Sequence, residues 1–240
     1  MNKETTIGQT ANYLGCSIET LRRWDKERKF IAYRKENNYR YYLLPDIEDF
    51  SEKLNLFKIA KHWIKSKRLF EILPRYFCPD SFVFKSRLTR LQRDLEEKNN
   101  SRDFSSLLSS IIGEIGNNSF DHNIGNWPDI TGIFFGYNLK KKTIVLVDRG
   151  QGILKTLKRI KPQLKNHQEA LKVAFTEIIS GRKPEHRGNG LKFVKIAIEN
   201  SKMKLFFQTG NAKINLKRNK KFQVKKSITS LRGCLVKIEF

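Results

Sequence analysis

The sequence predicts an α+β protein with an N-terminal helix-turn-helix and a C-terminal α/β sandwich built on a mixed sheet. Two short helical patterns separated by Gly15 occupy the first thirty residues. After residue 100, a long amphipathic helical pattern is followed by apolar strand patterns that end in glycines. A hairpin pattern around Arg218 and Asn219 adds strands near the C-terminus. The chain is therefore expected to hold two domains.

Charge favours a polyanionic partner. Lys and Arg total 48 against 24 Asp and Glu, which gives a formal net charge of +24 and a pI of about 10.0. Such an excess is typical of nucleic-acid-binding proteins, although a Lys-rich proteome would produce it as well. No Asp or Glu occurs between Glu199 and Glu239, so this segment is expected to form a cationic face.

Cysteine usage predicts a reduced, cytoplasmic protein. Cys16, Cys78 and Cys234 are odd in number, far apart and without C-x-x-C spacing, which favours neither a disulfide framework nor a zinc site. The first residues lack the apolar core of a signal peptide, and no apolar run is long enough to span a bilayer. We therefore expect neither secretion nor a membrane partner.

The first fifty residues carry the signals of a helix-turn-helix. Thr6 and Gln9 have capping-box spacing, and Gly15 ends the helix that they begin. Ser17 caps a second helix. Its period places Ile18, Leu21 and Trp24 inward and leaves Thr20, Arg22 and Arg23 outward.

These residues resemble the winged helix-turn-helix of the MerR family, from Thr6 to about Phe50. The matching features are "TLRRW" in the second helix, Arg34 at the start of the wing, "NNYRYY" at its end and the following "PDIEDF". One departure is Asn38, where the family usually has glycine at the wing turn. Asn tolerates the left-handed conformation, so the turn is expected to survive.

The resemblance implies double-stranded DNA as a partner. Thr20, Arg22 and Arg23 would face the major groove, while Arg34, Arg40 and Tyr42 would hold phosphates from the wing. The alternative is a MerR-like module used for protein contact, because the first fifty residues hold nine Lys or Arg against eight Asp or Glu.

Residues 53–80 are predicted to connect the two domains. An amphipathic helix from Lys53 to Arg68 is indicated by apolar residues at helical spacing, namely Leu56, Phe57, Ala60, Trp63 and Ile64. In MerR-like proteins a helix here makes the dimer, so we expect a homodimer. Packing on the rest of the chain explains the pattern equally well. His62 has no acidic neighbour of the kind expected at a phosphoacceptor histidine.

A second amphipathic helix carries polar residues that could form a site. Its apolar stripe consists of Phe104, Leu107, Leu108, Ile111, Ile112 and Ile115. Glu114, Asn117, Asn118 and Asp121 fall together at the edge of that stripe, and His122 follows one position beyond. By itself this arrangement equally fits a surface helix with a polar side.

Two glycine-rich segments accompany this helix. "VDRGQGI", residues 147–153, places an aspartate at a strand end before two glycines, and "HRGNGL", residues 186–191, opens a helix. Free N–H groups at such a helix start favour phosphate. The order Glu-x-x-x-Asn, Asp-x-Gly-x-Gly-Ile, Arg-Gly-x-Gly-Leu resembles the GHKL ATP-binding (Bergerat) fold, over roughly residues 80 to 240. The spacing of Glu114, Asn118 and His122 is most similar to its anti-sigma serine-kinase branch.

The resemblance implies ATP and Mg²⁺ as cofactors and assigns the residues. Glu114 would be the general base, Asn118 would complete the Mg²⁺ shell, and Asp148 would accept a hydrogen bond from the adenine amino group. The remaining implied contacts to the nucleotide are His122, Gly150, Gly152, Ile153, Arg187, Gly188, Gly190 and Leu191. A lid is expected within residues 153–187, where Arg182, Lys183 and Arg187 would reach the phosphates. Cys234 departs from the family's threonine, and a thiol is the weaker donor.

The sequence thus predicts a winged helix-turn-helix (1–52), a connecting or dimerisation segment (53–80) and a GHKL ATP-binding domain (81–240). The first functional hypothesis is a transcription regulator in which Mg-ATP alters binding to DNA or to a protein partner. The second is a protein serine or histidine kinase that uses the N-terminal module for localisation or protein contact. A mechanochemical ATPase similar to gyrase ranks third, because such proteins need further domains.

Overall fold

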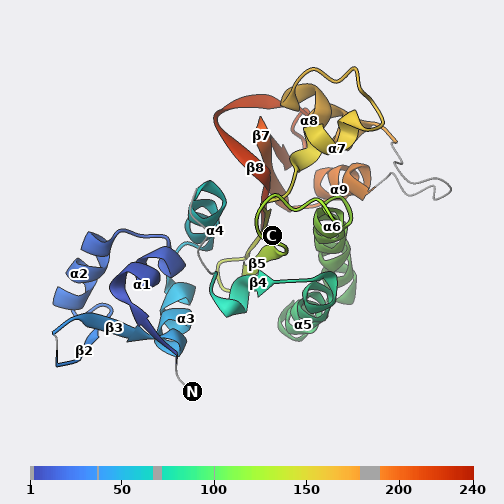
Figure 1. The fold of residues 1–240 in the computed structure, drawn as a ribbon. Helices are drawn as coiled ribbons and strands as arrows, with labels where there is room; N and C mark the ends of the chain where they lie inside the picture. The colour runs from blue at the N-terminus through green and yellow to red at the C-terminus, as the bar shows by residue number, and fades with distance from the viewer. Residues whose placement is uncertain (1–2, 37, 67–71, 100, 179–189) are drawn as a thin grey trace. The chain divides into compact units, whose positions relative to one another are not determined.

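The computed structural model describes residues 3–36, 38–66, 72–99, 101–178 and 190–240 (Figure 1). The chain divides into two compact units, residues 1–77 and 78–240. Each unit has its own sheet, so each is described by itself.

The N-terminal unit is a helix-turn-helix followed by a β-hairpin wing. Its elements are β1 (Glu4–Thr6), α1 (Ile7–Leu14), α2 (Ile18–Lys26), β2 (Tyr33–Arg34), β3 (Arg40–Leu43), α3 (Leu44–Lys53), α4 (Leu56–Lys65) and the short 3₁₀ helix η1 (Pro74–Tyr76). The three strands form an antiparallel sheet in the order β1-β3-β2. Asn38, with φ of 57°, adopts the left-handed conformation predicted for the wing turn.

The helix ends follow the sequence signals. Thr6 and Gln9 form the predicted capping box, which is thereby confirmed, and Gly15 ends α1 in the left-handed conformation. The Ser17 side chain accepts a hydrogen bond from the Thr20 N–H at the start of α2. Because both ends of this short connection are capped, the sequence alone defines where α2 begins.

The helix predicted from Lys53 to Arg68 is shorter than expected. The structure ends α3 at Lys53 and begins α4 at Leu56, because the Asn55 side chain caps the new helix by accepting from the Lys58 N–H. The apolar face of α4 is buried within this chain. Part of it packs on the Gly15 turn, where a Cβ on Gly15 would lie 3.1 Å from the Ile59 Cα. The homodimer assigned to this helix stays a prediction.

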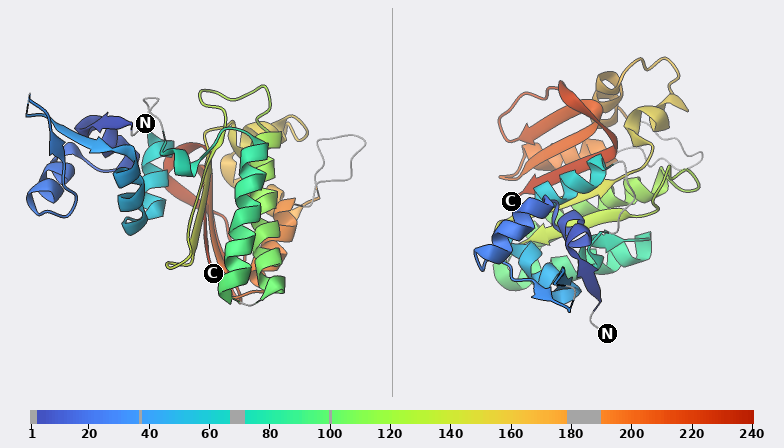
Figure 2. Two further views of the ribbon diagram at one scale, coloured as in Figure 1. Left: turned by 90° about the horizontal axis from the view of Figure 1, so that it is seen from below. Right: turned by 60° about the vertical axis from the view of Figure 1, so that its left-hand side comes forward.

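The C-terminal unit is the predicted α/β sandwich. Its elements are β4 (Phe77–Cys78), α5 (Ser81–Asn99), α6 (Arg102–Asp121), β5 (Ile133–Asn138), β6 (Thr143–Asp148), α7 (Gly152–Lys158), α8 (His167–Thr176), α9 (Gly190–Glu199), β7 (Lys204–Lys217) and β8 (Lys225–Glu239). The strands form one sheet in the order β4-β5-β6-β8-β7. Helices α5, α6 and α9 lie on one side of that sheet (Figure 2).

Three of the strand pairs in this sheet are antiparallel. They are β5 with β6, β6 with β8, and β8 with β7. A mixed sheet was expected from the sequence, but the short β5–β6 and β7–β8 connections are hairpins, and a hairpin joins antiparallel strands. The connection from Leu139 to Lys142 is too short for a crossover.

The core of this unit lies between α6 and the sheet. The predicted stripe residues Leu108, Ile111, Ile112 and Ile115 are all buried, and they share one cluster with Leu146 of β6. Each such side chain contributes about 1.5–3 kcal/mol when it is fully removed from water. This packing fixes the helix rotation and turns the polar edge of α6 toward the end of β6. No helix among the described residues has the length and apolarity needed to cross a bilayer.

Candidate functional site

The C-terminal unit contains a pocket at the end of β6. It holds about 570 Å³ of space, a figure that includes open solvent at its mouth. Its walls come from the last turns of α6, from α7, α8 and the first turn of α9, and from the sheet. The lining residues are Ile115, Asn118, Ser119, His122, Asn123, Asp148, Gly152, Ile153, Thr156, Leu157, Ala174, Leu191, Phe207 and Cys234.

Asp148 is the buried acid of this pocket. It is the last residue of β6 and only 2% exposed. Its carboxylate accepts hydrogen bonds from the Gly150 N–H at 2.9 Å, from the Ser119 hydroxyl at 3.0 Å and from the Cys234 thiol. Burial raises the pKa of Asp148 to about 6, although these hydrogen bonds act in the opposite direction. At neutral pH the pocket therefore presents a mostly ionised acceptor.

The glycines after Asp148 are required by their surroundings. The Asn123 side chain donates to the Ser119 carbonyl at 2.7 Å and accepts from the Gln151 N–H at 2.8 Å. A Cβ on Gly150 would lie 2.1 Å from the Asn123 Nδ2, so only glycine fits. Gly152 has φ of 74°, which a side chain would strain. Together these contacts hold the backbone of the loop against the wall of the pocket.

The polar edge of α6 meets the start of α9. A Cβ on Gly190 would lie 2.4 Å from the Glu114 Oε2 and 3.4 Å from the Asn118 Nδ2. Asn118 lines the pocket, whereas Glu114 is exposed one helical turn before it. Residues that are 72 to 76 positions apart in the sequence therefore lie together.

Most of the predicted nucleotide contacts gather at this pocket. Those that line it are Asn118, His122, Asp148, Gly152, Ile153 and Leu191. Gly150 lies against Asn123 of the wall, and Gly190 lies against Glu114 and Asn118. The predictions for Arg182, Lys183, Arg187 and Gly188 fall outside the described residues.

Sequence reasoning missed three polar residues of the pocket region. Ser119 follows Ile115 by four residues, and Asn123, just past the end of α6, follows Ser119 by four, so both continue the apolar stripe and the helical period did not indicate them. Thr209 accepts a hydrogen bond from the Ile153 N–H at 3.3 Å. It belongs to β7, and nothing in the local sequence shows that the sheet brings it to this loop.

Arg149, next to Asp148, is held on a separate anchor. It is buried and forms an ion pair with Asp129 at 2.6 Å, and Arg232 contacts the same carboxylate at 2.9 Å. Burial raises the pKa of Asp129, but the hydrogen bond from Arg149 and the neighbouring charges outweigh it and leave the pKa below the usual value. This ion pair ties the segment before β5 to the loop that carries Asp148.

The second candidate site is the outer face of α2. Arg22 and Arg23 are exposed, and the ion pair that Arg23 makes with Glu27 is long, at 4.0 Å. Thr20 is half-buried, and its hydroxyl lies 3.0 Å from the Ser17 hydroxyl. Two cationic side chains are thus available to a ligand, while Thr20 also takes part in the helix cap.

The wing arginines are bound to α2. Asp25 accepts from the Ala32 N–H at 3.0 Å, from the Arg34 guanidinium at 3.0 Å and from the Arg40 Nε at 2.7 Å. Burial raises the pKa of Asp25, but the Ala32 N–H and the two arginines outweigh this and hold the pKa below its usual value. The arginines therefore dock the wing on the helix, and both side chains remain partly exposed, Arg34 at 40% and Arg40 at 28%.

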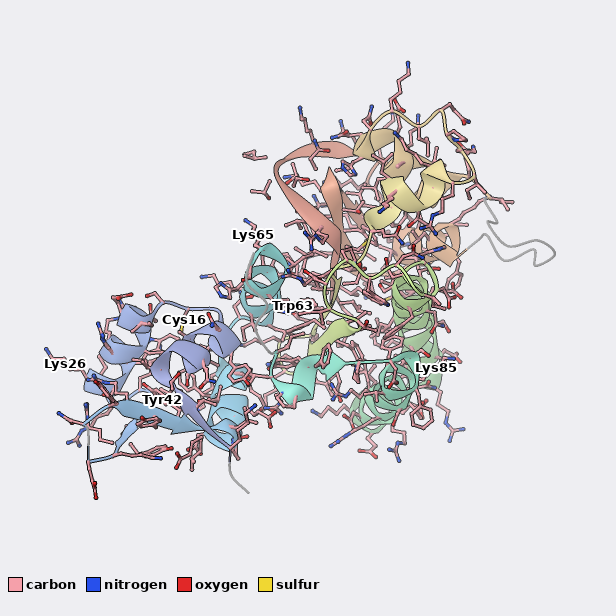
Figure 3. All side chains as sticks on the ribbon, in the orientation of Figure 1. Cys16, Lys26, Tyr42, Trp63, Lys65 and Lys85 are labelled. Carbon is pink, nitrogen blue, oxygen red and sulfur yellow. The ribbon has the colours of Figure 1, made fainter. Side chains whose placement is uncertain are left out.

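The phosphate contact predicted for Tyr42 is wrong. Its side chain, labelled in Figure 3, is 1% exposed. It stacks on Phe30 with ring centroids 4.8 Å apart. Phe30 in turn stacks on Phe50 at 4.3 Å. Because side chains alternate along a strand, Tyr42 shares the face of β3 that bears Arg40, the face turned toward α2. Arg40 reaches Asp25 at the end of that face, and Tyr42 fills its apolar part.

Known proteins similar to this chain were found both by sequence and by structure. Residues 6–42 match the family described as MerR family regulatory protein. The type II methyltransferase M.Eco47II of Escherichia coli is 41% identical over 59 residues, which are 24% of this chain and 14% of that protein. The 43K ATPase domain of Thermus thermophilus gyrase B, solved with an aminocoumarin, aligns at a TM-score of 0.33 and 16% identity over 67% of this chain and 40% of that chain.

The family match confirms that the N-terminal unit carries a MerR-type helix-turn-helix. The chain spans 14% of the methyltransferase and 40% of the gyrase chain. The assignment of the pocket therefore depends on its own residues.

Proposed function

We propose that this protein is a DNA-binding regulator whose C-terminal unit binds Mg-ATP in the pocket at the end of β6. The observation that carries the proposal is the buried Asp148 carboxylate, which lies in a pocket with otherwise largely apolar walls. A buried acid without a cationic partner costs free energy in the folded protein. Its position is best explained by a ligand that donates a hydrogen bond to it.

An adenine base suits the inner part of the pocket. Its exocyclic amino group is a donor, and the Asp148 carboxylate is the acceptor. Ile115, Ile153, Leu157 and Phe207 supply apolar surface for the faces of a flat ring. The hydroxyl of Ser119 and the thiol of Cys234 both donate to Asp148 and hold it in place.

The mouth of the pocket suits the phosphates with Mg²⁺. Among the described residues, no group of three or more His, Cys, Asp or Glu could hold a metal by itself. Mg²⁺ commonly takes most of its ligands from phosphates and water, so the amide oxygen of Asn118 would be a sufficient protein ligand. When bound, the ion would neutralise phosphate charge. The N–H groups at the start of α9, with Arg187 and Gly188 of the motif, would complete the phosphate site.

Glu114 supports a second candidate function, phosphotransfer to a protein partner. It is exposed, yet it lies against Gly190 and one turn from Asn118. A carboxylate at this place could take the proton from a water molecule or from a hydroxyl group of a partner protein. The regulator and the kinase share the ATP site and differ only in what Glu114 activates.

Calorimetric titration of Mg-ATP into the full chain tests the proposal. Wild-type protein should bind Mg-ATP, and Asp148→Asn should bind it at least tenfold more weakly. The amide NH₂ group of Asn can face the adenine amino group, and two donors cannot form a hydrogen bond. Asp103→Asn, an exposed change at the other end of α6, is the matched control and should bind as wild type does. No heat of binding at millimolar nucleotide, or equal affinity in all three proteins, would refute the pocket assignment.

A further inference from the structure

The positive charge of this protein is concentrated away from its helix-turn-helix. Residues 1–50 hold nine Lys or Arg against eight Asp or Glu. Residues 78–240 hold 32 against 14, a net charge of +18. Most of the attraction for a polyanion therefore originates in the C-terminal unit.

Much of this charge lies on one hairpin. We call it the basic hairpin and define it by Lys213, Lys217, Arg218, Lys220, Lys221, Lys225 and Lys226, at the end of β7, in the following turn and at the start of β8. Six of the seven are exposed, and residues 200–238 contain no acidic residue. Within the described part of the chain, the salt bridges include none of these seven side chains.

The fold presents these cations together. Ala212, Ile214 and Leu216 are buried on the inner face of β7, so the alternation along the strand turns Lys213 and Lys217 outward. Lys213 pairs directly with Lys225 across the two strands. Like charges in such a pair destabilise a sheet. An anion bound between them would remove that cost.

The turn extends the same surface. Asn219 has φ of 58°, and the Lys220 N–H donates to the Lys217 carbonyl at 3.3 Å. This reversal brings Arg218, Lys220 and Lys221 to the tip, next to Lys217. Cations from both strands and from the turn therefore gather at this end of the hairpin, although Lys226, which pairs with Ala212, lies on the opposite face from Lys225.

We propose that the basic hairpin is a second DNA contact, which binds the phosphate backbone of duplex DNA without reading sequence. Duplex DNA is the polyanion favoured here because the same chain carries a MerR-type helix-turn-helix. Six of the seven cations are lysines, which bind phosphates as point charges and lack the planar fork that reads guanine. The proposal does not depend on ATP binding.

Salt titration of the full chain with a fluorescent random-sequence duplex tests this contact. The test variant replaces Lys217, Arg218, Lys220 and Lys221 with Gln. The control replaces Lys85, Arg90, Arg93 and Lys98 of α5 with Gln, which removes the same charge from another exposed surface (Figure 3 labels Lys85). Each lost phosphate contact lowers the slope of log K against log salt by about 0.9. We expect a decrease of about two or more for the hairpin variant and of less than about one for the control.

Two outcomes would overturn the proposal: equal loss in both variants, or an unchanged slope in the hairpin variant. Loss of binding to phosphatidylserine vesicles with unchanged DNA binding would also overturn it, by assigning the surface to membranes. Thermal unfolding of each variant checks the fold, and the double variant Lys220→Gln/Lys221→Gln, confined to the turn, should show about half the effect. Mg-ATP affinity measured on the same proteins should be unchanged, which separates this contact from the pocket.

Discussion

Asp148 combines a structural cost with a proposed binding role. Its carboxylate is fully buried at the end of β6, and burial raises its pKa to about 6. Hydrogen bonds from Gly150, from Ser119 and from the thiol and backbone N–H of Cys234 hold it, yet no cation neutralises it among the described residues. Such an acid is costly to the folded protein, and the proposed ligand would offset part of that cost by donating to it.

Removing this acid should change how stability depends on pH. The pKa of Asp148 is higher in the folded protein, about 6, than in the unfolded chain, 3.8. Asp148 therefore adds to the free energy of unfolding in full below pH 3.8, and this contribution is lost as the pH rises through about 6. Between pH 5 and pH 8, the free energy of unfolding should therefore fall by about 1–2 kcal/mol more in the wild-type protein than in Asp148→Asn. Urea unfolding of both proteins at the two pH values measures this. A difference between the proteins that is the same at both pH values would show that Asp148 titrates normally.

Glu114 should matter for turnover and not for binding. Glu114→Gln keeps the shape of the side chain but removes the base, so ATP hydrolysis or phosphotransfer should fall by about 10²-fold or more while Mg-ATP affinity stays within about twofold. Single-turnover assays and calorimetry on the same preparations provide the two readouts. Glu97→Gln, an exposed change on α5, is the control. Wild-type turnover in Glu114→Gln would exclude Glu114 as the base.

At the scale of elements, helical period was the most informative signal. It predicted α6, its buried stripe and the polar edge that carries Asn118, because burial of one helix face is a local property of the sequence. Thr209 could not be predicted in the same way. Its contact with the Ile153 N–H spans 56 residues and depends on the register of β7 with β8.

In the wing, the phosphate contact that the MerR resemblance implied for Tyr42 was wrong. Arg40 and Tyr42 follow one another at a spacing of two, so both belong to the inner face of β3. Strand alternation could have indicated that Tyr42 is a core residue. The role of Asp25 in holding both wing arginines has no local signal, because it joins α2 to strands nine and fifteen residues away.

Arginines on α2 and on the wing should affect DNA binding differently. Arg22→Ala or Arg23→Ala should cost about 1–3 kcal/mol on a preferred site and relax its sequence, as loss of a base-edge contact does. Arg40→Ala should weaken binding to all duplexes alike, because it removes the proposed phosphate contact and one of the bonds that dock the wing on Asp25. Footprinting and salt titration separate the two patterns. Unchanged DNA binding in all three variants would indicate that the N-terminal unit contacts protein.

At the scale of the whole molecule, each of the two units carries its own candidate site. The sequence predicted both, since each has a local signature: capped helices with exposed arginines in one, and an acid and glycines at a strand end in the other. How one unit influences the other has no such signature. The proposed regulation requires a coupling free energy between ATP binding and DNA binding, and this quantity must be measured on the intact chain.

The most direct test of the regulator hypothesis is the affinity of the full chain for duplex DNA with and without saturating Mg-ATP. If nucleotide modulates DNA binding, the DNA dissociation constant should change by about fivefold or more, and DNA should change the ATP dissociation constant by the same factor. Asp148→Asn, at the same nucleotide concentration, should show little change. Equal DNA affinity with and without bound nucleotide in the wild-type protein would contradict the account.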